Sequence, residues 1–240
     1  MKLRMQTDSL ASNTAAQALI TTFAHDLRQP LRSIVMATQR IQRKAPELNE
    51  EIKAKLEEIL AAARRQEELI ASIVEYDQVF QTQPDSPIGL RLAIQTACMK
   101  IEAFRQAHRG SIQYDPEAIP RVQAPSGLTR VLEKVLHNSL KFHAPDNTPA
   151  IELEASDDCE GQIVVRVSDN GLGVEPQYRE VVFEPFKRLN PASEYAGSGI
   201  GLATCRRVME TMRGTIRFED HRNGAGSLIA LSFPKGQEPV

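Results

Sequence analysis

The stretch IELEASDDCEGQIVVRVSDNGLGVEP, residues 151–176, decides the fold of the larger part of the chain. Apolar and polar residues alternate over residues 151–156 and again over residues 162–170, which is the pattern of half-buried strands. Only a short polar turn separates the two runs, so we expect the strands to pair as an antiparallel hairpin. This part of the chain is therefore built on a sheet.

Helices and strands on both sides of this stretch define the fold class. We predict helices over residues 90–107, 126–142 and 200–212, a short extended piece over 111–114, and strands over 215–220 and 226–234. Because these elements mix without a regular βαβ alternation, the fold class is α+β. We expect an α/β sandwich in which helices cover one face of a mixed, largely antiparallel sheet.

The first eighty residues are different, because they contain no glycine and, ahead of Pro46, only one proline, Pro30. Apolar residues recur at helical spacing in two runs. The first run consists of Ile20, Phe23, Leu27, Ile34, Ala37 and Ile41, and the second of Ile52, Leu56, Ile59, Ala63, Ile70 and Ile73. With Asn49 as the start signal of the second helix, this pattern predicts two long antiparallel helices joined by a turn near Pro46.

A helical hairpin of this kind cannot enclose its own apolar face. Two copies that form a four-helix bundle bury both faces, so we expect a homodimer. The polar, proline-rich stretch QTQPDSPIG, residues 81–89, separates the hairpin from the sheet, and glycine becomes frequent after it. We therefore place the domain boundary there, with domains 1–82 and 83–240.

Composition narrows the class of protein. The 240 residues are 41% hydrophobic and 25% charged, which excludes wholesale disorder, and the net charge of −2 removes the main electrostatic reason to bind nucleic acid. No apolar run is long enough for a membrane segment or a secretory signal, so we expect a cytoplasmic protein with no membrane segment in this chain. Cys98, Cys159 and Cys205 lack the spacing of a zinc site, and we interpret them as reduced thiols.

The first candidate site is on the N-terminal helix. If Ile20 and Leu27 lie in the seam of a bundle, His25 points away from the seam into solvent. An exposed histidine alone is most often without function, but the neighbouring Asp26 can accept a proton or a hydrogen bond from the ring. Pro30 removes a backbone donor and bends the helix at a cost in stability, which favours a functional site.

Two polar clusters mark the middle of the second domain. Asn138 and Lys141 lie three residues apart on a predicted helix, which places a metal-binding amide and a cation on one face. Asp169 ends a predicted strand and is followed by Gly171 and Gly173. Taken alone, this second cluster is explained at least as well by a tight turn of a β-hairpin as by a binding site.

The third cluster precedes the helix predicted over residues 200–212. Its glycines, Gly197, Gly199 and Gly201, allow backbone amides to approach a phosphate, whose charge the helix N-terminus favours. A single glycine-rich loop is weak support for a phosphate site. The presence of all three clusters in this order is much stronger support for a nucleotide site.

Together with the segment around His25, these motifs resemble those of sensor histidine kinases. FAHDLRQPLRSI looks like the phosphoacceptor box, VLHNSLKF like the N box, DNGLGV like the first glycine box, FEPFKRL like the F box and GSGIGL like the second glycine box. GAGSLIALSFP resembles the final glycine-containing strand, so the resemblance extends over residues 23–234. The phosphoacceptor box and FKRLNPASEYAGSGIGLATCRRVME are most similar to the output module of phytochrome-type kinases.

The resemblance implies a dimerisation and phosphoacceptor domain followed by a catalytic ATP-binding domain that uses ATP and Mg²⁺. His25 would be the phosphorylated nucleophile and Asp26 would assist its attack. Asn138 would hold Mg²⁺, Lys141 would approach a phosphate oxygen, and Asp169 would accept a hydrogen bond from the adenine amino group. Further residues implied in nucleotide binding are Gly171, Gly173, Phe183, Phe186, Arg188, Gly197, Ser198, Gly199, Gly201 and Leu202.

These residues divide by role. The glycines after Asp169 would shape the adenine pocket, the F-box residues would anchor a mobile lid and touch phosphate, and the later glycines would let the lid close. The implied activity is that of an ATP-dependent protein histidine kinase of a two-component system, which phosphorylates His25 and passes the phosphoryl group to an aspartate of a response regulator receiver domain.

Two departures from the family pattern matter. Lys134 stands four residues before Asn138, where the family has a second Asn or an acid; a cation cannot bind Mg²⁺, so Lys134 weakens metal binding or neutralises phosphate instead. Gln29 follows His25 by four residues, where the family often has Thr or Asn, and shares its helical face. We interpret Gln29 either as a solvated helix former or as a catalytic residue that orients water against the regulator's phosphoaspartate.

Two other functions remain open. A degenerate kinase would act as a nucleotide-binding dimeric scaffold or phosphatase, and Lys134 is the feature that favours it. A gyrase-type or chaperone-type ATPase would lack the helical hairpin with its exposed His–Asp pair. The residues before Phe23 are too few for a sensor domain, so we expect either a fragment or an upstream sensor protein as partner.

The other four histidines show no metal-ligand spacing, and we expect solvated or locally bonded roles for His108, His137, His143 and His221. His143 follows Phe142 near the phosphate end of the expected site. It is therefore the one of the four that we expect near the nucleotide.

Overall fold

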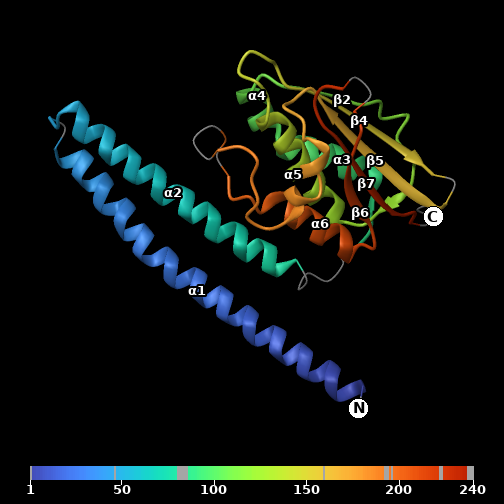
Figure 1. Cartoon of the computed structure of the whole chain (residues 1–240), viewed down its shortest axis with the longest axis horizontal. Helices are drawn as coiled ribbons and strands as arrows, with labels where there is room; N and C mark the ends of the chain where they lie inside the picture. Colours follow the sequence, from blue (N-terminus) through green and yellow to red (C-terminus); the bar gives the residue numbers. More distant parts are fainter. Residues whose placement is uncertain are drawn as a thin grey trace. The chain divides into compact units, whose positions relative to one another are not determined.

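The computed structural model describes residues 2–45, 47–79, 86–158, 160–191, 195, 197–221 and 224–236, with side chains from residue 20 onward. They form two compact units, of which the first contains the helical hairpin through Gln78 and the second begins at Val79 (Figure 1). The expected boundary between residues 82 and 83 lies outside the described residues, as does Cys159. Among the described residues, no helix combines the length and the apolar character that crossing a membrane requires.

The first unit consists of helix α1, Lys2–Lys44, and helix α2, Glu50–Gln78. Asn49 caps α2, because its side-chain oxygen accepts a hydrogen bond from the Ile52 amide at 2.8 Å. The predicted start of the second helix is therefore confirmed, whereas Pro46 in the predicted turn lies outside the described residues. Helix α1 continues through Pro30 without a break in its helical assignment.

A narrow apolar seam joins the two helices. Its buried members are Ala24 and Leu31 from α1 and Ala63 and Ile70 from α2, with Val35 and Val74 packed against them. Thr38 extends the buried row of α1 by another seven residues. Leu56 and Leu60 are buried on α2 in the same way.

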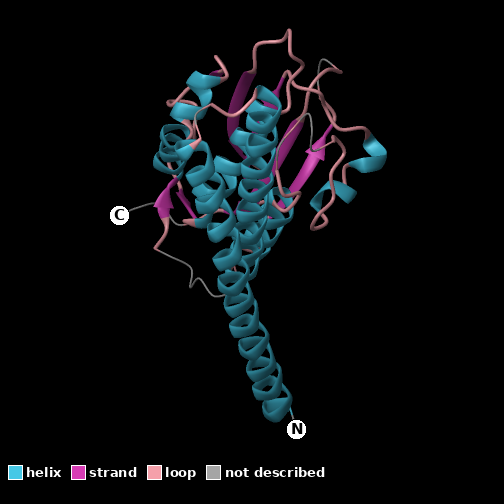
Figure 2. Cartoon of the chain, turned by 90° about the vertical axis from the view of Figure 1, so that its left-hand side faces the viewer, coloured by secondary structure: helices cyan, strands magenta, loops and turns pink. Residues whose placement is uncertain are grey.

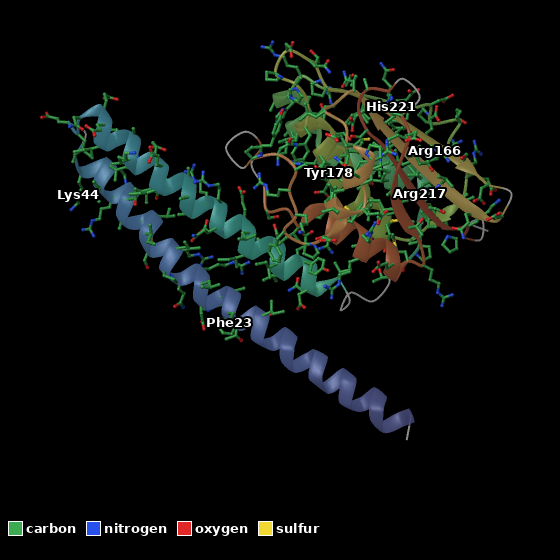
Figure 3. The ribbon with its side chains drawn as sticks, in the orientation of Figure 1. Phe23, Lys44, Arg166, Tyr178, Arg217 and His221 are labelled. Carbon is green, nitrogen blue, oxygen red and sulfur yellow. The ribbon has the colours of Figure 1, made fainter. Side chains whose placement is uncertain are left out.

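The apolar residues predicted to form the seam of α1 lie on the adjacent stripe instead. Phe23, Leu27, Ile34 and Ile41 are 46–57% exposed within one chain, and Figure 3 labels Phe23 on this helix. Positions 24, 31 and 38 precede 27, 34 and 41 by three residues, or about 60° around the helix. The single hairpin therefore closes on positions 24, 31 and 38, and the stripe predicted for the seam of a four-helix bundle stays exposed in one chain.

The second unit is an α+β sandwich, as predicted. It contains β1 (Ile88–Gly89), α3 (Leu90–Lys100), α4 (Glu102–Ala107), β2 (Ser111–Gln113), β3 (Gln123–Ala124), α5 (Gly127–Lys141), β4 (Ala150–Asp157), β5 (Gln162–Asp169), the 3₁₀ turns η1 (Pro176–Tyr178) and η2 (Val181–Phe183), α6 (Gly201–Thr211), β6 (Thr215–Glu219) and β7 (Leu228–Pro234). The main sheet has the order β2-β4-β5-β7-β6. Only the β2–β4 pair is parallel, so the expectation of a mixed, largely antiparallel sheet is confirmed.

One face of this sheet carries the core. Helices α3, α5 and α6 lie along it (Figure 1), and the strands of the sheet are drawn in magenta in Figure 2. Alternate strand residues such as Leu153, Val165 and Leu231 are at most 2% exposed and pack against apolar helix residues such as Leu132 and Leu136. The apolar residues at every second strand position and those on one face of α5 therefore pack together in one layer.

The opposite face of the sheet is polar. Glu219 lies between two arginines, at 2.8 Å from Nε of Arg166 and 2.6 Å from Nη2 of Arg217, and Ser168 bonds His221 at 2.9 Å. Figure 3 labels Arg166, Arg217 and His221 in this unit. Burial acts to raise the pKa of Glu219, but the two arginines outweigh it and hold that pKa below its ordinary value. Charged and polar side chains thus dominate this side of β5 and β6, although Val164 on the same side of β5 is buried.

Two local expectations were incomplete or wrong. The helix predicted over residues 90–107 is divided at Ile101 into α3 and α4. The hairpin-turn interpretation of the residues after Asp169 is wrong, because β5 pairs with β4 and β7 and is followed in the chain by η1, not by a strand that pairs with it. The residues after Asp169 therefore do not connect two paired strands.

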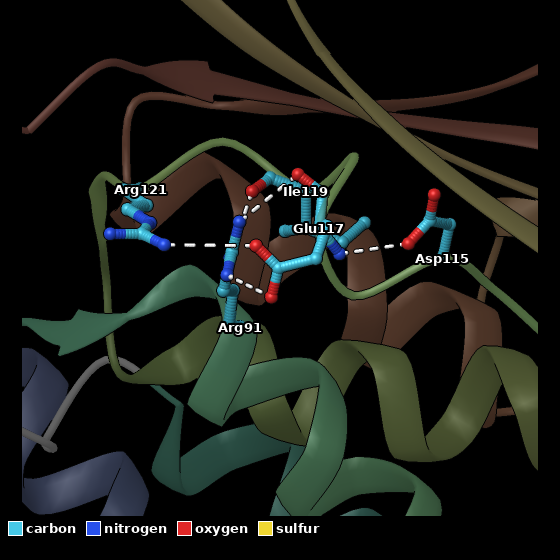
Figure 4. A network of polar contacts seen from close by, with 5 residues as sticks. All are labelled: Arg91, Asp115, Glu117, Ile119 and Arg121. Atoms are coloured by element: carbon cyan, nitrogen blue, oxygen red, sulfur yellow. Dashed lines mark hydrogen bonds and ion pairs between the residues drawn. The ribbon is translucent and has the colours of Figure 1, made fainter.

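Arg91, at the start of α3, holds the loop after β2 (Figure 4). Its guanidinium donates to the carbonyl oxygens of Ile119 at 3.0 Å and Glu117 at 3.1 Å, and to the Glu117 carboxylate at 3.1 Å. Arg121 contacts the same carboxylate at 3.6 Å from a largely exposed position. Arg91 therefore joins α3 to a loop whose Ile119 is buried in the core.

We expect Arg91→Lys to lower the free energy of unfolding by about 1–2 kcal/mol, because one ammonium cannot replace a fork that bonds two carbonyls. Denaturant unfolding measures this change. Arg121→Lys is the matched control and should change stability by less than about 0.5 kcal/mol, since an exposed ion pair contributes little. Equal losses of stability in both variants would contradict the conclusion that Arg91 stabilises the fold through its bonds to the two carbonyl oxygens.

Candidate functional site

Asp169, at the end of β5, is a buried carboxylate at 7% exposure. Its Oδ2 accepts a hydrogen bond from Ser139 Oγ of α5 at 2.7 Å. Its Oδ1 accepts from the backbone amides of Gly171 at 2.9 Å and Ser227 at 3.0 Å. One side chain thus joins a helix, its own turn and the chain that leads into β7.

The electrostatics of Asp169 suit an acceptor of one further hydrogen bond. Burial raises the pKa of its carboxyl above the ordinary value of 3.8, and the bonds from Ser139, Gly171 and Ser227 oppose that rise. A carboxylate offers about four lone-pair positions, of which these partners fill three. The position left on Oδ2 is suited to a donor such as the amino group of a purine.

The turn after Asp169 closes tightly against the end of α5. The carbonyl oxygen of Phe142 accepts the Leu172 amide at 2.9 Å. A Cβ at Gly171 would lie 2.4 Å from that same oxygen, so only glycine fits there. Gly173 follows with a positive φ of 73°.

Three polar residues follow one face of α5 at half-buried positions: Lys134, Asn138 and Lys141. Within the described part of the chain the Asn138 carboxamide makes no hydrogen bond, and the Lys141 ammonium lies 4.8 Å from the centre of the Phe142 ring. This donor set supplies a single neutral oxygen beside cations. It fits a Mg²⁺ ion only if phosphate and water provide most of the metal's octahedral shell, as they commonly do.

Three of the remaining histidines gather beside α5. Phe104 stacks on His137 at 3.9 Å between ring centres and also contacts His108 at 4.2 Å, and His108 meets His143 edge-on at 5.8 Å. Burial lowers the pKa of His137, and the positive charge of Lys141 lowers it further. The contacts between these rings make them a packing cluster. Among the described residues, no group of three His, Cys, Asp or Glu side chains that could hold a metal ion occurs.

The F-box residues have three different environments. Phe183 is buried against Phe218 at 5.6 Å, with the guanidinium of Arg206 4.1 Å from its ring centre, so it anchors this segment in the core. Phe186 is 58% exposed and has a positive φ of 66°. Arg188 donates from Nη2 to the carbonyl oxygen of Tyr195 at 2.6 Å.

The second glycine box returns to this segment. The Gly199 carbonyl accepts the Phe186 amide at 3.0 Å, and with φ of 72° a Cβ at Gly199 would meet Lys187 O and Arg188 Cγ at 3.0 Å. Gly197 also has a positive φ, 143°. Ser198 precedes Gly199, and Gly201 and Leu202 are the first residues of α6. The N-terminus of α6 therefore directly follows Gly197 and Gly199.

On the first unit, His25 and Asp26 are exposed side by side, with 70% and 68% of their side chains accessible. His25 Nδ1 lies 3.6 Å from Asp26 Oδ1, which is an ion-pair distance and too long for a hydrogen bond. Gln29 is exposed one turn further along α1. The structure thus places the three residues together on an accessible stretch of helix.

Several residues that hold the site together were not among those predicted from the sequence. Ser139 is buried between Leu136 and Leu140, and a serine among apolar positions signals a polar partner. Ser227 acts through its backbone amide, which no side-chain pattern reveals. Tyr195 lies in the quoted phytochrome-like stretch, but only the fold shows that its hydroxyl donates to His143 O at 2.8 Å.

Comparison with protein families agrees with this division into two units. Residues 15–79 match the His Kinase A (phospho-acceptor) domain. Residues 123–237 match the family of histidine kinase-, DNA gyrase B- and HSP90-like ATPases. Asp169, Asn138 and the glycine boxes lie within the second match, and His25 lies within the first.

Two relatives illustrate the sequence similarity. The phytochrome-like protein Cph1 of Synechocystis is 28% identical over 228 residues, which cover 94% of this chain and 30% of Cph1. The signal transduction histidine-protein kinase/phosphatase MprB of Mycolicibacterium vanbaalenii is 30% identical over 250 residues, which cover 98% of this chain and 50% of MprB. The chain thus spans between about a third and a half of these curated relatives.

Among solved structures, full-length ShkA in complex with AMPPNP has the same fold over 93% of this chain and 47% of ShkA, with a TM-score of 0.69 and 19% identity. The phosphoacceptor and ATPase matches together with these relatives lead to one family. The chain belongs to the sensor histidine kinases, with a His Kinase A domain followed by a histidine kinase-type ATPase domain.

Proposed function

We propose that this chain is an ATP-dependent protein histidine kinase of a two-component system, with phosphoacceptor domain 1–82 and catalytic domain 83–240. The observation that carries the proposal is the combination of two features in one chain. Asp169 is a buried carboxylate with one acceptor position left for a purine, and His25 with Asp26 is an exposed nucleophile beside an acid.

The first proposed step is in-line attack of the His25 imidazole on the γ-phosphorus of ATP. The bond from that phosphorus to the β–γ bridging oxygen breaks and ADP leaves. Asp26, at 3.6 Å from Nδ1, faces that nitrogen and favours the positive charge that the ring develops, which leaves Nε2 for the attack. In the second step the phosphoryl group passes from the ring to a carboxylate oxygen of an aspartate in a response regulator.

The catalytic domain contributes position and charge. Asp169 would orient adenine, Lys141 and Arg188 would approach phosphate oxygens, and Asn138 would hold Mg²⁺. When bound, Mg²⁺ supplies charge neutralisation on the phosphates. Phosphoryl transfer needs little covalent help from a protein, so such positioning accounts for most of the rate.

We further propose that the phosphoacceptor domain dimerises. The apolar stripe of α1 is exposed in the single chain and is continued on α2 by Ile52 and Ile59, both 44% exposed. A second copy that packs its own stripe against this one forms a four-helix bundle and buries both. His25 stays outside the seam, at the surface where a regulator docks.

The proposal extends to the place where the chain acts, its protein substrate and the source of its signal. The chain acts in the cytoplasm, on a response regulator receiver domain as its protein substrate. An upstream sensor domain or sensor protein supplies its signal. The relatives that are named sensor kinases and a phytochrome-like protein support these roles.

A second candidate function rests on Lys134. This cation lies one turn before Asn138 on the same face of α5, where it competes with a metal ion for the same phosphates. A chain with impaired transfer would act as a nucleotide-binding dimeric scaffold or as a phosphatase. Autophosphorylation of the purified chain decides between the two functions.

We expect His25→Gln to abolish acid-labile labelling from γ-labelled ATP, because no other described histidine lies beside an acid on an exposed helix. ATP binding and the mass of the dimer should not change. The control His221→Gln, in the other unit, should keep its label. Acid-labile phosphate that persists on His25→Gln would contradict the assignment.

We expect Asp169→Asn to weaken ATP and ADP equally, by about ten- to a hundredfold, because both share the base. Asn138→Ala should instead weaken the magnesium complex of ATP more than metal-free ATP. Calorimetry with and without Mg²⁺ measures both effects. Asp220→Asn changes an exposed carboxylate and should leave affinity unchanged, and the same magnesium dependence in all variants would refute this division of roles.

Asp169→Asn also has a pH signature. A raised pKa in the folded chain means that the proton binds more tightly there than in the unfolded chain, so this group stabilises the fold below pH 3.8 and loses that contribution as pH rises through the raised value. The unfolding free energy of Asp169→Asn relative to the parent should therefore improve as pH rises above about 4. No change in the difference with pH would contradict burial as the cause of the shift.

We expect Gln29→Ala to keep autophosphorylation but to slow dephosphorylation of a cognate phosphorylated regulator by about tenfold, because the amide would orient the attacking water. A decay time course with purified phosphoregulator measures this. Gln39→Ala, further along the same helix, is the control. Decay at the parent rate would leave Gln29 as a solvated helix residue.

A further inference from the structure

Ser139 places a hydroxyl in the apolar layer of α5. It is 5% exposed and is flanked along the helix by the fully buried Leu136 and Leu140. A hydroxyl in a helix commonly bonds a carbonyl of the preceding turn, but Ser139 donates to Asp169 Oδ2 at 2.7 Å, 30 residues further along the chain. Because a hydroxyl has a single hydrogen, Ser139 directs its whole donor capacity to this carboxylate.

The two oxygens of the Asp169 carboxylate have different partners. Oδ1 accepts two backbone amides, from Gly171 at 2.9 Å and from Ser227 at 3.0 Å, and an amide N–H cannot accept a hydrogen in return. Among the described residues, no side chain other than Ser139 donates to Oδ2. A proton that binds this carboxylate therefore binds Oδ2, the oxygen that has a position left for a base.

The protonation state of Oδ2 decides which base it can bind. An ionised Oδ2 accepts a hydrogen from the amino group of adenine and repels the keto oxygen of hypoxanthine, whereas a protonated Oδ2 donates to a keto oxygen. Burial raises the pKa of Asp169, and the bond from Ser139 acts against that rise. Ser139 therefore favours the ionised carboxylate, which accepts.

The other neighbours of this carboxyl are neutral, with one exception. The turn after Asp169 and the segment before β7 present backbone amides, and β4 pairs Ile151 with Asp169. His221, which follows β6, is the titratable group whose charge also lowers the pKa of Asp169. A test of Ser139 by pH must therefore control for His221.

We propose that Ser139 is a positioning residue that sets base specificity: by donating to Oδ2 it keeps that oxygen an acceptor, so the site binds a purine with an amino group and rejects one with a keto oxygen in the same place. The inference rests on the proposed function, in which Asp169 receives the adenine amino group. Ser139 itself touches no reacting atom. Its loss therefore changes which base is bound and leaves the phosphate contacts in place.

The test uses Ser139→Ala and two nucleotides, ATP and inosine triphosphate. They share ribose and triphosphate, and inosine triphosphate has a keto oxygen where ATP has its amino group. Calorimetry on the whole chain measures both affinities between about pH 5.5 and about pH 8. We expect the ratio of ATP affinity to inosine triphosphate affinity to fall by about tenfold or more in Ser139→Ala, as for the loss of a hydrogen bond to a charged group.

The dependence on pH separates this role from general support of the fold. ATP requires the ionised carboxylate, so its affinity falls as pH drops through the pKa of Asp169. Removal of the Ser139 bond raises that pKa, so the fall begins at a higher pH in Ser139→Ala than in the parent chain. The phosphates titrate alike in both nucleotides and cancel in the ratio.

Three control variants accompany the test. Ser232→Ala removes a half-buried hydroxyl that donates to Gln162 at 3.0 Å in the same unit, and it should leave both affinities unchanged. In a His221→Gln background, Ser139→Ala should still move the pH profile upward. In an Asp169→Asn background it should no longer alter the pH dependence of the ratio, because the amide does not titrate in this range.

Equal losses of affinity for ATP and inosine triphosphate, or a ratio that does not change with pH, would overturn the specificity role. A parent-like ratio and pH profile of Ser139→Ala would overturn it while the proposed kinase function stands. If Ser139→Ala does not fold, Ser139→Cys carries the same test, because its thiol is a weaker donor: an intermediate ratio supports the role and a parent-like ratio contradicts it. A parent chain that binds no ATP would overturn the proposed function and this inference together.

Discussion

The hydrogen bonds of the buried Asp169 carboxylate organise the ATPase unit. A buried carboxylate is costly unless its oxygens have donors, and here the donors come from three separate segments: Ser139 in α5, Gly171 in the following turn and Ser227 before β7. Satisfying one group therefore sets the distance between helix layer and sheet. It also leaves one acceptor position of the carboxylate without a donor among these three.

Backbone groups set the remaining geometry of the site. The Phe142 carbonyl accepts Leu172 and leaves no room for a side chain at Gly171, and the Gly199 carbonyl accepts Phe186. Tyr195 joins these two regions by its hydroxyl bond to His143. The turn after Asp169 and the F-box segment are thus each held by hydrogen bonds to backbone carbonyls.

The two units use their apolar surface differently. The ATPase unit buries Leu132, Leu136 and Val165 completely in one core, so it is closed on itself. The hairpin buries a narrow row of side chains, among them Ala24, Leu31 and Ile70, and leaves Phe23 and Leu27 exposed. A unit with a narrow internal seam and an apolar outer stripe is suited to repacking against a partner, whereas a closed unit is suited to holding one small ligand.

The sequence by itself determined the α+β class, the pairing of β4 with β5, the cap at Asn49 and the grouping of His25 with Asp26, because period, turn residues and neighbours in the chain are local properties. It did not determine which stripe of α1 closes on α2, since residues of two adjacent stripes are apolar and only the packing of the two helices selects one of them. Nor did it reveal the partners of Asp169 or the bond from Tyr195 to His143. Apart from the local bond from Gly171, those contacts join residues that are tens of positions apart, and only the tertiary structure brings their donors and acceptors within hydrogen-bond distance.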